Sequence, residues 1–299
     1  MKPETIQILG TLQVLIEPSL YFYLPYHEDG GKGVPFVWEV AEKGEFNLLN
    51  LSREKGWLRL TDVAPVLKSW QDLEYLKSFP DFSLDSSQKA LRDTKFLELQ
   101  QILETDLHNC EAFILPYEGW SNSPGIIIGQ TPDQDWICIA PTVYIPSEIP
   151  NDVIARSPLP TPKPSQPLPE QTIGSLLKIQ AIILELGSIQ LNGDFGGGYY
   201  YEYTHQLVCA AAHTKELAIF TALQASGTLE IHQFDRLFSE RDQEDLSYDR
   251  LNQFLKQNLS PLMVYRFSFW TDENIYIIAP YESEDWLGLY LNSVFVYNP

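Results

Sequence analysis

Apolar residues recur three and four positions apart at two places in the chain, residues 5–16 and 172–183. This spacing gathers apolar side chains on one side of an α-helix, so it predicts an amphipathic helix at each place. Shorter stretches rich in aromatic and β-branched residues predict strands at 36–40, 126–129 and 276–279. Because short turns join consecutive strands, we expect the strands to pair antiparallel.

The two halves of the chain repeat the same pattern in the same order. Four blocks match: residues 5–13 with 172–180, 58–69 with 229–240, 96–107 with 248–259, and 125–139 with 275–289. In the last pair, each block holds a strand, an acidic turn that ends in Asp-Trp, and a second strand. Two such large copies are too few for a solenoid, so the pattern predicts a tandem duplication of one globular domain.

Each copy is predicted to contain a helix, a glycine-rich turn, strands, a strand followed by a short helix, a long helix and a final strand pair. The strand with its short helix begins at Leu58 in the first copy and at Leu229 in the second. Asp85 and Gln88 have the spacing of a capping box and predict the start of the long helix. The sequence thus predicts an α+β protein with two tandem α/β/α sandwich domains, each with a mainly antiparallel sheet flanked by helices.

Closely spaced prolines separate the two copies. Proline fixes φ and lacks a backbone N–H, so a proline-rich segment favours an extended polyproline II path and acts as a semi-rigid spacer. The predicted boundaries are residues 1–145 for the first copy, 146–169 for the linker and 170–299 for the second copy. A second interpretation of the linker, as a docking peptide for a proline-binding module, stays open.

Composition is that of a protein without membrane segments. The 299-residue chain is 44% hydrophobic, which supplies enough apolar residues for a core in each half. No apolar run approaches the ~20 residues that cross a bilayer, and the first residues lack the basic and apolar regions of a signal peptide. Three cysteines without close spacing fit reduced thiols better than disulfides. We therefore expect a cytoplasmic protein that does not act at a membrane.

The chain is strongly acidic, and the charge is shared by both halves. The net charge is -20; residues 1–150 carry 11 basic and 22 acidic side chains (-11), which leaves 9 and 18 (-9) for the remainder. Affinity for phosphate groups needs a basic surface, so this charge argues against nucleic acid as a partner. A basic protein partner, by contrast, would be attracted.

Motifs that carry chemistry are absent from the sequence. The glycine clusters lack the Gly-Lys-Ser/Thr ending of a phosphate-binding loop, and no Gly-x-Ser-x-Gly turn occurs. His205, Cys209 and His213 are four residues apart, which would suit a metal on a helix, but the surrounding alternation predicts a strand. We expect packed or surface histidines there, and no catalytic residues, metal or cofactor.

Several local sequences resemble the nuclease A inhibitor family. In the second copy these are 236–240, the acidic segment 242–249, the helix 251–259, and the strands 264–266, 275–278 and 294–296; the first copy adds Pro35-Phe36-Val37-Trp38-Glu39. The resemblance implies a non-enzymatic α/β/α domain that blocks a sugar-non-specific, metal-dependent nuclease. Such a nuclease has a basic cleft for phosphates, which an acidic inhibitor can occupy as a phosphate substitute.

The resemblance also indicates where the partner would bind, because in that family an acidic residue after the first helix and the carboxyl end reach the nuclease. The nearest matches are Glu28 and Asp29, Asp194 in the second copy, and the terminal Pro299. The Asp-Trp turns add interface candidates, since tryptophan often anchors interfaces. The candidate partner-binding residues are Glu28, Asp29, Trp136, Asp194, Glu284, Asp285, Trp286 and Pro299. The alternatives are solvated turns for the acidic residues and the core for the tryptophans.

A second function is compatible with the same features. The chain would then be an assembly or scaffolding protein that kept the fold without nuclease inhibition. Inhibition needs carboxylates at an edge that faces the nuclease cleft, whereas scaffolding favours an exposed apolar patch or a groove between the domains.

Overall fold

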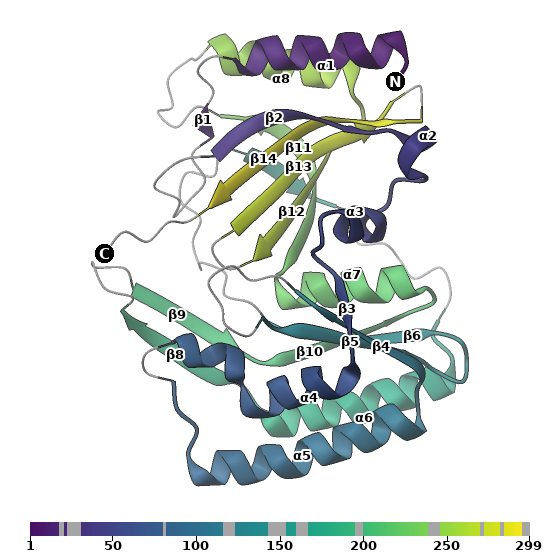
Figure 1. Ribbon diagram of the computed structural model, residues 1–299, viewed down its shortest axis with the longest axis vertical. Helices are drawn as coiled ribbons and strands as arrows, with labels where there is room; N and C mark the ends of the chain where they lie inside the picture. The colour runs from purple at the N-terminus through teal and green to yellow at the C-terminus, as the bar shows by residue number, and fades with distance from the viewer. Residues whose placement is uncertain are drawn as a thin grey trace. The chain divides into compact units, whose positions relative to one another are not determined.

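The computed structural model describes residues 1–17, 21–22, 31–79, 82–115, 123–142, 154–159, 167–194, 200–238, 246–269, 272–281 and 284–294 (Figure 1). Contacts divide the chain into two compact units, and neither unit is a continuous stretch. Unit 1 consists of Met1–Leu51, Ser147–Pro162 and Leu229–Asn298, and unit 2 chiefly of Ser52–Pro146 and Lys163–Thr228. Each unit therefore draws on both predicted copies. None of the helices that the structure describes combines the length and the apolar character needed to span a bilayer.

Unit 1 is built on a sheet with the strand order β1-β2-β14-β13-β12-β11-β7. The strands are β1 (Tyr21–Phe22), β2 (Gly31–Trp38), β7 (Ile154–Pro158), β11 (Leu229–Leu237), β12 (Met263–Phe269), β13 (Asp272–Pro280) and β14 (Trp286–Val294). Every neighbouring pair is antiparallel, and for the consecutive strands β12, β13 and β14 this confirms the prediction from their short connections.

Two helices, α1 (Pro3–Ile16) and α8 (Leu246–Asn258), lie side by side over one face of this sheet (Figure 1). Leu12 of α1 and Leu255 of α8 pack with Ile277 and Leu289, and all four side chains are fully buried. The alternation along β13 and the three-to-four spacing along α1 bring these side chains into one core. Two short helices, α2 (Val40–Lys43) and α3 (Leu48–Glu54), follow β2.

Unit 2 has a sheet with the order β10-β6-β5-β4-β3 and a separate hairpin of β8 and β9. Its strands are β3 (Arg59–Thr61), β4 (His108–Ile114), β5 (Gly125–Gln130), β6 (Trp136–Pro141), β8 (Ile189–Asp194), β9 (Tyr200–His205) and β10 (Leu207–Ala212). Ile126, Ile127 and Ile128 are consecutive and all fully buried, which requires cover on both faces of the sheet.

Helices supply that cover in unit 2. The helices are α4 (Val63–Asp72), the 3-10 helix η1 (Glu74–Ser78), α5 (Ser86–Thr105), α6 (Glu170–Leu186) and α7 (Lys215–Ser226). Helix α7 lies on one side of the sheet, and α5 and α6 pack together on the other (Figure 1). The predicted capping box starts α5: Asp85 accepts from Gln88 N, and Gln88 Oε1 accepts from Asp85 N. Together the units confirm the α+β class with mainly antiparallel sheets.

The predicted copies do not fold separately, and this prediction is wrong. When the copies are aligned, both sheets have one order, with β2-β14-β13-β12-β11 in unit 1 matching β10-β6-β5-β4-β3 in unit 2. In each of these orders the first strand comes from one copy and the other four come from the other copy. Strand β2 of the first copy pairs with β14 of the second, and β10 of the second pairs with β6 of the first. Residues 1–145 and 170–299 thus exchange their opening helix and strands. Both copies carry the same apolar pattern on these elements, so the exchange keeps the same kind of contacts.

Two further predictions about connections need correction. The linker 146–169 is more than a spacer, because its residues Ile154–Pro158 form β7 and pair with β11 at the edge of the sheet, a position that tolerates proline. The strand that begins at Leu229 continues as β11 to Leu237, so residues 234–237 are in a strand and not in the predicted short helix, and residues 239–245 lie outside the described residues. In the first copy the strand β3 is short, and the predicted helix is α4, whose first turn accommodates Pro65.

Candidate partner-binding site

The two Asp-Trp turns occupy matching positions, between β13 and β14 in unit 1 and between β5 and β6 in unit 2. In the first turn, Tyr281 N donates to Asp285 O at 2.8 Å and Glu284 N to Tyr281 O at 2.8 Å. In the second, Thr131 and Asp135 make the same bond at 2.8 Å. Glu284 and its counterpart Gln134 both have φ 69. The prediction that these turns are equivalent is confirmed.

Asp285, which we expected to face a partner, instead lies in the interior with 6% of its surface exposed. Its Oδ1 accepts from Val40 N at 3.0 Å, and its Oδ2 accepts from Thr5 Oγ1 at 3.4 Å. Thr5 is in the first turn of α1, so the carboxylate fastens the start of this helix to the turn. Both carboxylate oxygens of Asp285 therefore accept hydrogen bonds within unit 1. Of the two neighbouring acidic residues, Glu284 is the exposed one.

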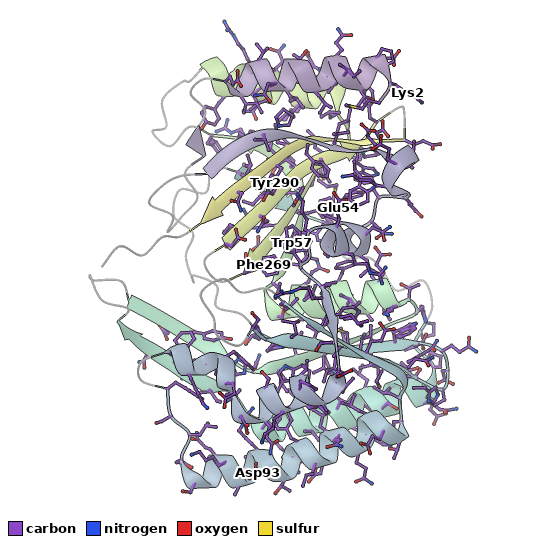
Figure 2. All side chains as sticks on the ribbon, viewed as in Figure 1. Lys2, Glu54, Trp57, Asp93, Phe269 and Tyr290 are labelled. Atoms are coloured by element: carbon purple, nitrogen blue, oxygen red, sulfur yellow. The ribbon has the colours of Figure 1, made fainter. Side chains whose placement is uncertain are left out.

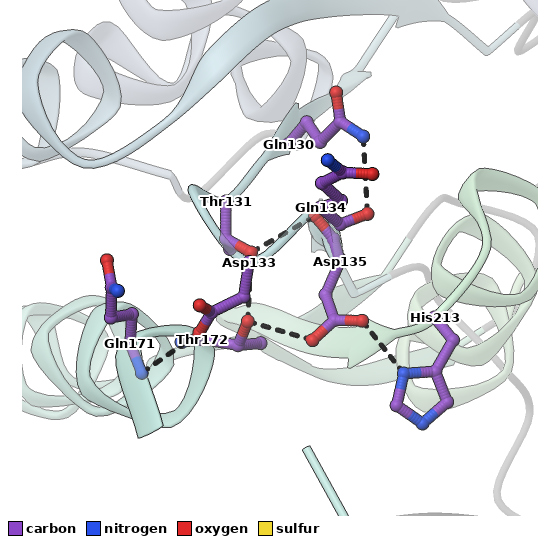
Figure 3. A network of polar contacts seen from close by, with 8 residues as sticks. All are labelled: Gln130, Thr131, Asp133, Gln134, Asp135, Gln171, Thr172 and His213. Carbon is purple, nitrogen blue, oxygen red and sulfur yellow. Dashed lines mark hydrogen bonds and ion pairs between the residues drawn. The ribbon is translucent and has the colours of Figure 1, made fainter. Parts of the chain in front are cut away.

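Asp135 makes the corresponding contact with a threonine in unit 2, but its second contact is with a histidine side chain (Figure 3). Its Oδ2 accepts from Thr172 Oγ1 at 2.9 Å, and its Oδ1 is 2.8 Å from His213 Nδ1. Asp133 Oδ2 accepts from Gln171 N at 3.1 Å, at the amino end of α6 where the helix dipole favours negative charge. We name the Asp285–Thr5 and Asp135–Thr172 contacts the aspartate latches. Each latch joins a turn of one copy to a helix of the other.

Both candidate tryptophans are partly buried rather than free. The ring of Trp286 lies 4.3 Å from that of Phe46, centroid to centroid, at an angle of 30°. Lys215 Nζ lies 5.5 Å from the centroid of the Trp136 ring, in a cation–π contact. Each ring keeps some accessible surface beside its turn, so both can contribute to an interface only at the edge of a contact.

Four exposed carboxylates belong to residues that are close in sequence to those of the unit 1 latch and its contacts. Glu4 precedes Thr5, Glu284 precedes Asp285, and Glu42 and Glu45 flank the contacts that Val40 and Phe46 make with this turn. We name this group, Glu4, Glu42, Glu45 and Glu284, the acidic rim. Cations close to these residues in sequence are Lys2, at the start of α1 (Figure 2), and Lys43, whose Nζ is engaged 5.0 Å from the centroid of the Trp38 ring. The N-terminal ammonium of Met1 is 3.5 Å from Glu39 Oε2.

The remaining candidates cannot be compared with the structure in full. Glu28, Asp29 and Pro299 lie outside the described residues. Asp194 ends β8 and pairs with Tyr200 through the backbone, and its side chain lies outside the described part.

His205 is a packed histidine, as the strand pattern predicts. Its side chain is buried, with Nε2 3.1 Å from Tyr75 OH and Nδ1 2.9 Å from Tyr203 OH. Tyr203 donates its single proton to the carbonyl oxygen of Thr142, so Nδ1 must donate to Tyr203 and Nε2 must accept. Burial, together with the charge of Arg92, lowers the pKa of His205 to about 3. This histidine is therefore neutral and fully engaged.

Other chemistry finds little support in the part of the chain that the structure describes. There, no group of three or more His, Cys, Asp or Glu side chains could hold a metal ion. His213 contacts Asp135 and lies 36% exposed, in keeping with a surface histidine. Burial raises the pKa of the Cys209 thiol to about 11 and raises that of Cys138 further, so neither thiol is activated.

Sequence analysis missed a buried ion pair in unit 1. Arg266 Nε donates to Glu273 Oε2 at 2.7 Å, and Ser268 Oγ donates to the same oxygen at 2.9 Å. Burial raises the pKa of Glu273 and the charge of Arg266 opposes that shift. The signal was available, because Val264, Arg266 and Ser268 alternate along β12 on one face, with two polar residues where apolar ones are expected.

A groove between α4 and α5 is the second surface feature of note, and it lies within unit 2. It encloses about 390 Å³, and its lining includes Leu67, Lys68, Phe96, Leu97, Leu103 and Glu104. Leu97 is 68% exposed at its rim, whereas Phe96 and Leu103 are buried. This volume is near the lower limit of small-ligand pockets and suits one or two apolar side chains of a partner.

Comparison with known proteins leaves the family undetermined. No protein-family model, curated protein or solved structure matches this chain. The relation to the nuclease A inhibitor family therefore remains a prediction from local sequence, and the function has to be inferred from geometry and charge.

Proposed function

We propose that this chain is a non-enzymatic pair of protein-binding units, and that unit 1 binds a basic protein through the acidic rim. The proposed partner class is the one that the family resemblance implies, a sugar-non-specific, metal-dependent nuclease. The supporting observation is the rim itself. Four exposed carboxylates come from three separate places in the chain, and at each place a residue next to or near them contacts the turn that the buried Asp285 holds in place.

The different positions of the neighbouring carboxylates Asp285 and Glu284 support this proposal. Asp285 has both oxygens bound inside the unit, which gives the turn a defined shape. Glu284 projects from that turn with exposed surface, and Trp286 offers an apolar edge next to it. Because the chain has a net charge of -20, its field steers a basic partner toward the surface before the specific contacts form.

The experiment measures inhibition and association rate for a purified basic nuclease of this class, with and without salt. The rim variant carries Glu4→Gln, Glu42→Gln and Glu284→Gln, and the control carries Asp62→Asn, Glu202→Gln and Asp249→Asn, all exposed. Both variants lose three negative charges. We expect the rim variant to associate roughly tenfold more slowly at low salt, and the control to change far less. Raising the ionic strength until the Debye length is about 8 Å should weaken the wild-type contact.

Two results would count against the rim. Equal losses in the two variants would show that only net charge matters, and the geometry of the turn would then have no part in binding. Absence of inhibition at stoichiometric excess in low salt would remove the nuclease as the partner class and favour the scaffolding alternative.

The groove between α4 and α5 is the specific observation that favours that alternative. Its exposed Leu97 and apolar floor would hold a partner through contacts that salt does not weaken. Pull-downs at low and high salt therefore separate the two functions. A scaffolding partner should survive high salt and be lost with Leu97→Lys, but not with Leu184→Lys, which changes another exposed leucine.

A further inference from the structure

Each sheet is completed by an arm from the other copy. The first arm runs from α1 to β2 (residues 3–38), and the second from α6 to β10 (residues 170–212). Each arm could pair with either of two sheets, because the matching sheet of its own copy offers the same edge. We propose that two ion pairs between α5 and α6 bias the arms toward this exchanged arrangement, and that without them the arms also exchange with a second copy of this chain.

The aspartate latches cannot make the choice. Thr5 and Thr172 are the same residue at the same place in their helices, and each binds the aspartate of an equivalent turn. Either threonine could therefore close either latch. The selection has to come from positions at which the two copies differ. Two such contacts follow the second arm directly, His213 with Asp135 and Lys215 with Glu111.

The contact between α5 and α6 contains such positions. Lys178 Nζ lies 2.6 Å from Asp106 Oδ2, and Lys95 Nζ lies 2.5 Å from Glu185 Oε2. Side-chain exposure is 18% for Asp106 and 14% for Lys95, so each pair has one sheltered partner and is less screened than a fully exposed pair. The hydrogen bond from Lys178 lowers the pKa of Asp106, in keeping with a formed ion pair.

The other arm and its helix lack these charges. By the alignment of the copies, the four matching positions are neutral: Thr11 and Pro18 in the first arm, and Ser247 and Asn258 in α8. If the arms closed on their own copies, Lys178 would meet Asn258, and Asp106 would meet Thr11. Both ion pairs would be lost and no new pair would form, although Lys95 would keep its pair with Glu98 of the same helix. The charges thus favour the exchanged arrangement over the unexchanged one.

Loss of this preference has a physical consequence for assembly. An arm that no longer distinguishes between equivalent sheets can close on its own copy, on the other copy, or on the same site of a second chain. The last case is domain swapping, which creates a dimer from contacts that already exist in the monomer. The partner fitted by the open sheet edge is therefore a second copy of this chain.

A single substitution reports which arrangement is present. Ala210 of β10 lies directly opposite Cys138 of β6, so Ala210→Cys places two thiols across an antiparallel pair. Exchange within a chain then gives an intrachain disulfide, and exchange between chains gives a linked dimer. If the arm closes on its own copy, position 210 meets Gly288, the residue that matches Cys138 in β14, and no disulfide forms.

The test refolds the full chain carrying Ala210→Cys under oxidising conditions and maps the disulfide by mass spectrometry. The test variant adds Lys178→Gln and Glu185→Gln; the control adds Lys68→Gln and Asp72→Asn, which remove an ion pair within α4. We expect the control to keep the intrachain product. In the test variant, the ratio of intrachain to other products should fall by about two- to thirty-fold, the range for two partly exposed pairs.

Equal product ratios in the test variant and the control would overturn the proposal. If Ala210→Cys prevents folding, carbodiimide coupling of the unsubstituted chain provides the second measurement. It should join Lys178 to Asp106, and a mixture of heavy and light isotope-labelled chains should show this link within single chains. Absence of the Lys178–Asp106 link within single chains would show that the arms are not exchanged, and it would also overturn the proposal.

Discussion

Replacing Asp135 with alanine would test whether its carboxylate holds α6 on the sheet of unit 2. The carboxylate accepts a hydrogen bond from Thr172 at 2.9 Å and lies 2.8 Å from His213. Its side chain is only 6% exposed, so alanine removes the charged acceptor of the buried Thr172 hydroxyl and leaves it only the neutral Thr131 Oγ1, 2.8 Å away. Hydrogen bonds to charged groups contribute about 1.5–3 kcal/mol each. Because His213 is 36% exposed and can turn to water, we count its bond only in part.

The expected loss in the free energy of unfolding is therefore about 2–4 kcal/mol, or a fall in Tm of roughly 5–15 °C for a unit of this size. Urea and thermal denaturation of the full chain, followed by circular dichroism, measure it. A double-mutant cycle with Thr172→Val should give a coupling of about 1 kcal/mol or more. Gln134→Asn is the matched control, because this neighbour is exposed and asparagine tolerates its positive φ.

A loss below about 0.5 kcal/mol, the usual range of surface substitutions, would refute the structural role of Asp135. Additive effects of Asp135→Ala and Thr172→Val would do the same for the latch. Loss of nuclease binding with unchanged stability would instead return the carboxylate to the partner-binding surface, where the sequence had placed its counterpart Asp285.

Three other predictions follow from single contacts. Gly288→Ala should prevent unit 1 from folding stably, as judged by near-ultraviolet dichroism, because an added Cβ would lie 2.0 Å from the carbonyl oxygen of Ile277 at φ +154; native-like stability would contradict this. His205, with a pKa near 3 when folded against an ordinary 6.5, takes up its proton mainly on unfolding, so stability should fall as pH drops from about 6.5 toward 3. Comparing urea midpoints at pH 7 and 5 for wild type and His205→Gln checks this, since the variant should lose less on acidification. Cys138 and Cys209 should react with a thiol reagent at pH 7.5 far more slowly in the folded protein than in urea, because burial raises both pKa values; equal rates would show that the thiols are accessible.

Local patterns predicted the elements well, because the signals for a helix or a turn lie within a few residues. The spacing of apolar residues identified α1 and α6, and the pair Asp85 and Gln88 identified the first turn of α5. The equivalence of the Asp-Trp turns was also visible in the sequence. Each of these predictions depends on residues that are close together along the chain, so contacts with distant residues change the predicted element little.

Pairing between elements could not be predicted in the same way. Both copies present the same alternation to a neighbouring strand, so the pattern of β2 fits β6 as well as its actual partner β14. The role of Asp285 escaped notice because its partner Thr5 is 280 positions away. Adjacent Glu284 and Asp285 look alike in the sequence, yet the turn directs one carboxylate outward and the other into the unit. The sequence does not indicate which copy supplies the opening helix, α1 or α6, that packs on each sheet.

The exchange changes how binding has to be studied, because the acidic rim is composite. Glu4, Glu42 and Glu45 belong to the first copy and Glu284 to the second, yet all lie in unit 1. Cutting the chain within 146–169 would divide the rim between two fragments, so comparing the halves cannot reveal which copy binds. A partner that contacts the whole rim would bind the exchanged arrangement in preference to the unexchanged one, and by mass action it would stabilise the closed arms. Partner binding and arm exchange should therefore be linked, so that weakening the charges between α5 and α6 in unit 2 also lowers affinity at the rim of unit 1.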